Sequence, residues 1–372
     1  VRCPLSHLRM RTVVVCTAWA PAHAALARAY LAKRFLTREP VWLERAREAG
    51  LRAERIDVAL LEVQLTMGRV ATESGDPEGA AAAFRKVLDR QGADVEALLG
   101  LADALVLAGK AGDAEGAARR ALVASPSYWA VHNKLGIVLV SSGRVDEAAA
   151  AFRRAVELAP ENALSLVNLG SALVLAGRLE EASRALQRSI DVEPTAQALS
   201  ALGTVEYYRG RFDEAVVRCE EAVALLPGFS TLWVNLGDAR RWSSSSRQKA
   251  AEAYARAIDA AGQDLRVNPR DVDAHLALAA SYAKTGRTAE AAPHVAAAVA
   301  ADPENPDVLY QAAVCDAAAG RIPEAADLLA RAVARGAPRW QVDADPELSA
   351  VRASAAYRET TARERTTGPK KR

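Results

Sequence analysis

Apolar residues recur along the chain at helical spacing, and glycine, proline and small polar residues separate the helical segments. The stretch 129–160 is typical. Leu135 and Leu139 lie four residues apart, as on one face of a helix, and Gly143 then suits the left-handed conformation that ends a helix. A second apolar stripe follows with spacings of four and three residues: Ala148, Phe152 and Ala155. Pro160 stops this second helix, so the pattern predicts two helices joined by a short turn.

The same pair of helices recurs with a nearly constant step. Prolines follow one another after 34, 34, 33, 42 and 34 residues: Pro126, Pro160, Pro194, Pro227, Pro269 and Pro303. Small residues keep the same step where the two helices should touch: Gly68, Ala102, Gly136, Gly170, Gly203, Gly237, Ala279 and Ala313. A third set is all alanine: Ala80, Ala114, Ala148, Ala182, Ala215, Ala250, Ala291 and Ala325. Such a step is typical of stacked repeats, so we expect an all-α stack and not several unrelated domains.

These units resemble tetratricopeptide repeats. That family's pattern has a large residue at position four, Leu at seven, a small residue at eight, Ala at twenty and Pro at thirty-two. From Trp129, positions four, seven, eight, eleven, twenty, twenty-four, twenty-seven and thirty-two are His132, Leu135, Gly136, Leu139, Ala148, Phe152, Ala155 and Pro160. The resemblance implies a right-handed α-α superhelix, a tetratricopeptide solenoid, of about nine helical hairpins.

We expect the solenoid to span residues 20–339. An N-terminal segment at 1–19, which begins with valine, is interpreted as a fragment edge or an unusual start. A capping helix is expected at 340–364, because the last unit of a stack needs a cover, and a basic disordered tail at 365–372. The hairpin at 196–229 is one residue short, with Glu206 at a packing position.

A narrower resemblance concerns three segments. The inserted turn at 36–42, the junction at 268–271 and the closing stretch at 343–348 are similar to the C-terminal repeat region of bacterial eukaryotic-like serine/threonine protein kinases. The sequence contains no glycine-rich loop with a strand lysine, no HRD and no DFG. If the relationship holds, the chain carries only the docking half of such a protein.

Charge and cysteine content narrow the function classes. The 48 basic and 46 acidic residues leave a net charge of +2, whereas a nucleic-acid-binding protein should show a basic excess or stripe. The longest apolar run near the start, 12–20, is too short to cross a bilayer, so no membrane insertion is expected. The four cysteines form no CxxC pair, which favours the cytoplasm.

No arrangement of residues typical of catalysis is found. The sequence has no GxxxxGK, GxSxG or HExxH motif, and neither cofactor nor metal is expected. His132 and His275 share position four of their units and are interpreted as packing residues, as is Cys219 at position twenty-four. Acidic pairs such as Glu180-Glu181 recur where second helices begin, and their negative charge there interacts favourably with the helix dipole. We therefore predict that the protein is not an enzyme.

The candidate site is a peptide groove. In the resembled family, ligands contact positions two, five, six, nine, twelve and thirteen of the first helices. Polar residues at position six are Lys134, Asn168 and Asn235, and amides there can hold a peptide backbone. Positions twelve and thirteen add the residue types enriched at binding hot spots: Tyr207, Tyr208, Arg241 and Trp242. Two interpretations stay open, because the amides could simply be solvated and the aromatic residues could pack between neighbouring irregular units.

The predicted function is a scaffold that holds a protein or peptide partner in this groove. One alternative is the docking or regulatory half of a bacterial serine/threonine kinase. An RNA-binding helical repeat is a second, which the near-zero net charge disfavours.

Overall fold

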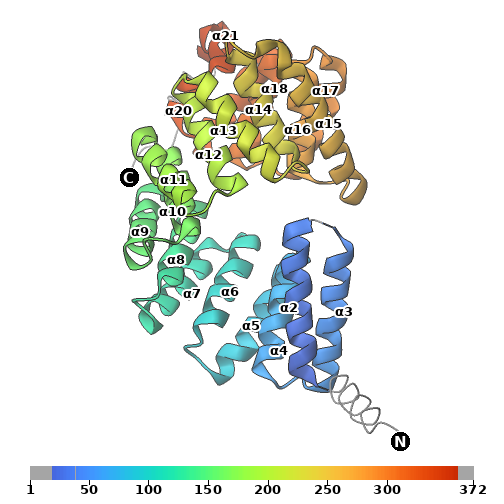
Figure 1. Ribbon diagram of the computed structural model, residues 1–372, viewed down its shortest axis with the longest axis vertical. Helices are drawn as coiled ribbons and strands as arrows, with labels where there is room; N and C mark the ends of the chain where they lie inside the picture. The colour runs from blue at the N-terminus through green and yellow to red at the C-terminus, as the bar shows by residue number, and fades with distance from the viewer. Residues whose placement is uncertain (1–18, 38, 359–372) are drawn as a thin grey trace, which may run out of the picture. The chain divides into compact units, whose positions relative to one another are not determined.

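A computed structural model describes residues 19–37 and 39–358 (Figure 1). This part of the chain contains helices and no strand, as the sequence predicts. Consecutive helices pack in pairs, and they fall into two compact units, residues 1–160 and residues 161–372. The continuation of all hairpins as one stack stays a prediction.

The first unit contains four helical hairpins within its described residues. Their helices are α2 (Ala20–Thr37), α3 (Val41–Ile56), α4 (Leu61–Glu73), α5 (Pro77–Arg90), α6 (Val95–Leu107), α7 (Ala111–Ala124), α8 (Trp129–Ser141) and α9 (Val145–Leu158).

The second unit continues the pattern with five hairpins as far as residue 334. Their helices are α10 (Ala163–Leu175), α11 (Leu179–Val192), α12 (Ala196–Tyr208), α13 (Phe212–Leu225), α14 (Ser230–Trp242), α15 (Ala250–Val267), α16 (Val272–Lys284), α17 (Thr288–Ala301), α18 (Pro306–Ala318) and α19 (Ile322–Ala334). A short 3-10 helix, η1 (Arg247–Lys249), replaces the usual turn before α15, where the serine run lies.

Local chemistry explains where the helices begin and end. Asp94, Asn162 and Asp271 each accept a hydrogen bond from the backbone N–H three residues later, at 2.8, 2.8 and 3.0 Å, which caps a first helix. At the other end of α8, Gly143 has φ of 71°, and the N–H of Arg144 donates to the carbonyl of Leu139 at 2.9 Å. The turn between the helices is therefore encoded by its glycine.

The small residues lie where the two helices of a hairpin touch. A Cβ atom placed on Gly136 would lie 2.5 Å from the ring of Phe152, and one on Gly237 would lie 2.4 Å from the ring of Tyr254. Real side chains do not approach so closely, so glycine lets a large ring of the second helix lie against the first helix. In other hairpins a fully buried alanine lies at the same repeat position as Gly136, namely Ala102, Ala279 or Ala313.

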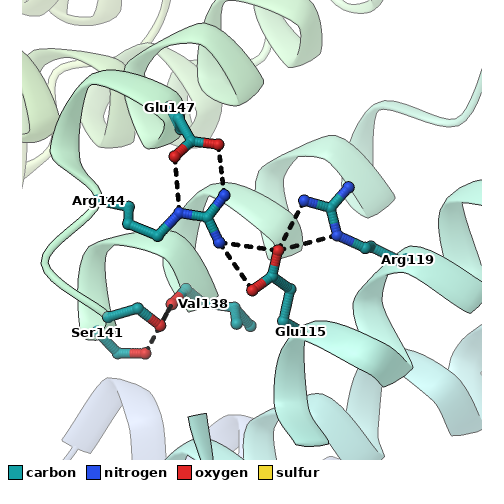
Figure 2. A network of polar contacts seen from close by, with 7 residues as sticks. Glu115, Arg119, Val138, Ser141, Arg144 and Glu147 are labelled. Carbon is teal, nitrogen blue, oxygen red and sulfur yellow. Dashed lines mark hydrogen bonds and ion pairs between the residues drawn. The ribbon is translucent and has the colours of Figure 1, made fainter. Parts of the chain in front are cut away.

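An ion-pair network joins neighbouring hairpins in the first unit (Figure 2). Arg144, in the turn before α9, donates to Glu147 in its own hairpin at 2.7 Å and to Glu115 of α7 at 2.8 Å. Arg119 donates to the same Glu115 at 2.9 Å. These hydrogen bonds lower the pKa of the Glu115 carboxyl. Because the network is largely exposed, solvent screens its charges and it adds little stability, but it links α7 to the turn before α9.

The chain after α19 differs from the predicted capping helix at 340–364. It forms α20 (Arg339–Ala344), the 3-10 helix η2 (Pro346–Leu348) and α21 (Ser349–Ala353), and residues 355–358 are helical again after a bend at Ser354. Pro346 is the physical reason, because proline disfavours helical geometry at the residue before it and Asp345 is accordingly extended, with ψ of 117°. The segment 1–18 and the basic tail lie outside the described residues.

Candidate functional site

A cavity of about 410 Å³ lies in the second unit. It opens on the face formed by the first helices α10, α12, α14, α16 and α18, which we call the first-helix face. All five helices contribute lining residues, among them Tyr207 of α12, Asp238 of α14, Lys284 of α16 and Gln311 of α18. Asp345, from the chain beyond the last hairpin, also lines the cavity. The first-helix face is therefore in contact with the C-terminal part of the same chain.

Residues 339–347, which we call the strap, lie against the first-helix face. The indole N–H of Trp340 donates to the carbonyl of Leu175 at the end of α10, at 3.1 Å. Its ring meets the ring of Tyr208 edge to face, with 5.3 Å between centroids. The side chain of Gln341 donates to the Tyr208 hydroxyl at 2.7 Å. These contacts hold the start of the strap on α10 and α12.

Asp345 is the buried acid of the strap, with 4% of its surface exposed. The hydroxyl of Tyr310 on α18 donates to its carboxylate at 2.6 Å, and the backbone N–H of Glu347 donates to its other oxygen at 3.0 Å. Tyr207 of α12 approaches that oxygen at 3.5 Å. Burial raises the pKa of Asp345 above its ordinary value, so these donors offset only part of the desolvation.

Glu347 is the second buried acid of the strap, and its side chain is 5% exposed. The Nε of Arg241 donates to its carboxylate at 2.8 Å, and the indole N–H of Trp242 donates to the same oxygen at 3.1 Å. Both donors belong to the last turn of α14. A buried carboxylate that accepts one hydrogen bond from a charged donor and one from a neutral donor is held in a fixed orientation.

A buried ion pair lies beneath these contacts. The ammonium of Lys284, whose side chain is 2% exposed, lies 2.6 Å from the carboxylate of Asp238. The hydroxyl of Tyr254 donates to the same Asp238 oxygen at 2.7 Å. Burial lowers the pKa of Lys284, but the negative charges of Asp238 and Glu347 outweigh it and the net direction is upward. Lys284 is therefore charged and adds positive potential beneath the strap.

Four of the seven predicted site residues are brought together by the fold. Tyr207, Tyr208, Arg241 and Trp242 all contact the strap, as described above. The rings also pack between neighbouring hairpins, because Phe212 lies 5.5 Å from Tyr207 and 6.1 Å from Trp242 between ring centroids. The packing that the sequence left open is present, and the binding of a partner by these side chains stays a prediction.

The three predicted polar residues at position six have other surroundings. Lys134 belongs to the first unit and forms an ion pair with Asp103 of α6. Asn168 is partly buried in α10 and already interacts with another part of the chain. Asn235 lines the cavity, and its amide donates to the hydroxyl of Ser200 at 3.1 Å, which links α14 to α12. Binding of a partner by these three side chains stays a prediction.

Sequence reasoning missed much of the site. Asp238, Lys284 and Tyr310 occupy positions nine, thirteen and five of their repeats, so the same groove register, applied to every hairpin, would have found them. For the strap, the sequence signals are Trp340 in an aromatic-poor chain and the Asp345-Pro346-Glu347 sequence. Neither signal indicates which surface the strap contacts.

The remaining candidates for chemistry have structural roles. His132 and His275 each bond to the carbonyl of the proline six residues earlier, at 2.8 and 3.1 Å, as does Trp233 at the same repeat position. Cys219 and Cys315 are buried, and burial raises the pKa of each thiol to about 12. In the described part of the chain, no group of histidine, cysteine and acidic residues has the arrangement of a metal site. Over the same residues, no helix has the length and apolar character needed to cross a membrane.

Several solved structures are similar to the chain, and one of them, with a TM-score above 0.5, shares its fold. The crystal structure of the APC/C hetero-tetramer Cut9–Hcn1 matches with a TM-score of 0.53 and 21% identity, over 78% of this chain and 52% of that one. TTC0263, a thermophilic TPR protein of Thermus thermophilus, matches with a TM-score of 0.45 and 22% identity, over 48% and 98%. PilF of Pseudomonas aeruginosa matches with a TM-score of 0.45 and 18% identity, over 59% and 96%. No curated protein matches the chain with significance.

Family models agree with the repeat pattern. One tetratricopeptide repeat model matches residues 65–128, 133–198 and 240–306, which together are more than half of the chain. Two further models of the same description match residues 195–226 and 282–353. The narrower resemblance to kinase repeat regions stays a prediction. Members of the matched family generally are scaffolds for protein–protein interaction and not catalysts. The chain belongs to the tetratricopeptide repeat family.

Proposed function

We propose that the chain is a scaffold that binds an extended segment of a partner protein on the first-helix face of its second unit. The observation that carries the proposal is that this face already holds a protein segment, the strap. The residues that hold it include Arg241, Trp242 and the two adjacent tyrosines, which are the residue types that dominate binding energy at interfaces.

Site-specific crosslinking tests this function. A photo-crosslinking amino acid at Gln311, an exposed cavity-lining position on α18, is expected to trap a partner protein from a lysate of the native organism. The matched control carries the same group at Val217, a half-exposed position on the second helix α13. Trapping of the same proteins at both positions, or at neither, would contradict a specific first-helix site.

The same experiment separates the alternatives. A docking role for a serine/threonine kinase rests on the sequence resemblance, and it would be supported by a kinase among the trapped proteins. We propose no nucleic-acid partner, because the net charge is +2. The proposed location is the cytoplasm, where free thiols such as Cys219 stay reduced.

A further inference from the structure

Two kinds of contact hold the strap on the second unit: Val342, which is 1% exposed, packs in the apolar core of the last hairpins, and hydrogen-bond donors of the first-helix face aim at the two acids of the strap. Arg241 and Trp242 donate to Glu347, and Tyr310 donates to Asp345. These donors come from two helices, α14 and α18, that are separated in sequence by α15, α16 and α17. The face therefore presents a preformed receptor for two carboxylates that are two residues apart.

Removing the strap would deprive Arg241, Trp242 and Tyr310 of these carboxylates and leave Arg241 with the carbonyl of Lys284, at 3.3 Å. A guanidinium that loses a carboxylate exchanges a charge-assisted hydrogen bond for weaker ones. The ammonium of buried Lys284, which is paired with Asp238, lies on the same face, and the charge of Glu347 also acts on it. Any segment that takes the place of the strap must therefore bring acceptors of its own, and carboxylates satisfy an arginine best.

The part of the chain beyond the strap is attached by apolar packing, in the same core that holds Val342. Leu348 and Val351 are fully buried, and they pack in the apolar core that α18 and α19 form. These two side chains can stay in place after the acids of the strap have left the face. A tethered strap would then remain near its site at an effective concentration in the millimolar range, and so compete with every other ligand.

From this arrangement we propose that the strap is an internal competitor for the first-helix face. The partner that replaces it is an acidic protein segment with two carboxylates two residues apart. The inference rests on the proposed function and names the chemistry of its partner.

A binding measurement with the full-length chain tests the inference. The probe is a fluorescent peptide with the sequence of residues 337–348. Glu347→Ala in the chain removes the acceptor of Arg241 and Trp242, so it loosens the strap without changing the face. We expect this variant to bind the probe about tenfold more tightly than the unchanged chain, because internal competition is weakened. Arg241→Ala added to it should abolish the gain.

Two controls accompany this measurement. Glu324→Ala removes an exposed acid at the start of α19 and should leave the affinity for the probe unchanged. A probe in which both acids are replaced by their amides should not bind. Equal affinity of the unchanged chain and Glu347→Ala, or no binding by either, would overturn the inference.

Hydrogen exchange provides a readout that needs no substitution. Excess probe added to the unchanged chain should speed amide exchange in residues 339–347 and not in α18. Unchanged exchange at saturating probe would also overturn the inference. If a partner is trapped at Gln311 and the probe still fails, the scaffold function stands and only the internal competition is wrong.

Discussion

At the scale of single residues, the hairpins depend on the absence of side chains at a few positions. Gly136 leaves room for the ring of Phe152, which is 2% exposed. Gly116 on α7 has the opposite surroundings, since a Cβ atom there would meet nothing within 4 Å. Replacement of glycine by alanine should therefore change the free energy of unfolding in opposite directions at the two positions.

We expect Gly136→Ala to lower the free energy of unfolding by about 1–2 kcal/mol, because overpacking outweighs the better helix propensity of alanine. Gly116→Ala is the matched control and should raise it by about 0.5–1 kcal/mol. Urea unfolding followed by circular dichroism measures both changes. A stabilising effect of Gly136→Ala would show that the helices can separate without cost.

The buried Lys284–Asp238 pair makes a second residue-scale prediction. Lys284→Met leaves the carboxylate of Asp238 without its cation, which should cost about 3–5 kcal/mol of unfolding free energy. Asp238→Asn keeps an acceptor for the Tyr254 hydroxyl, so adding it to Lys284→Met should restore part of the loss. Additive losses in this double-mutant cycle would contradict a direct interaction between the two charges.

At the scale of elements, the hairpin of α16 and α17 contains a pair of histidines. The Nδ1 atoms of His275 and His294 are 2.9 Å apart, while Nε2 of His275 contacts the carbonyl of Pro269. Donation from Nε2 leaves Nδ1 of His275 as the acceptor from His294. Tyr282 stacks on His294, and the guanidinium of Arg287 lies over Tyr282. Protonation of both imidazoles would place a proton on each facing nitrogen and break their hydrogen bond.

The stability of this hairpin should therefore depend on pH. Burial, and then the nearby His275, lower the pKa of His294 below its ordinary value of 6.5. The unfolded chain thus binds a proton more readily, and stability falls as the pH drops below about 6.5. Between about pH 7.5 and about pH 5.5, we expect His294→Gln to lose less thermal stability than the unchanged chain. Parallel losses in the two proteins would exclude His294 as the cause.

Sequence reasoning succeeded for the hairpins and failed for the chain end. The hairpin depends on contacts between residues that are close in sequence, such as Asp94 with Ala97 and Gly136 with Phe152. The stretch predicted as one capping helix is interrupted twice, at the extended Asp345 before Pro346 and at the extended Ser354, which no short-range pattern indicates. The repeat register places Tyr207, Tyr208, Arg241 and Trp242 on the first-helix face, where they contact the strap, and their binding of a partner stays a prediction.

At the scale of the whole molecule, the helices form two compact units, residues 1–160 and residues 161–372. In repeat proteins, each hairpin is stabilised mainly by its neighbours, so a local loss need not spread through the chain. Gly136 and Lys284 lie in different units and provide a test of this independence.

We expect Gly136→Ala to speed hydrogen exchange in α8 and α9 and to leave α16 to α19 unchanged. Lys284→Met should have the reverse pattern. Mass spectrometry of exchanged peptides resolves the two sets of helices. Equal acceleration of both sets by each variant would show that the chain unfolds as one cooperative body.

The sequence by itself determined the repeat, the hairpins and the family, because each depends on short-range spacing of apolar, small and capping residues. Only the tertiary structure decided that the first-helix face is occupied. Trp340 and its partner Leu175 are 165 residues apart, and Glu347 and Arg241 are 106 apart. No local preference links such residues, since their meeting depends on how successive hairpins stack and so on the packing of every helix between them.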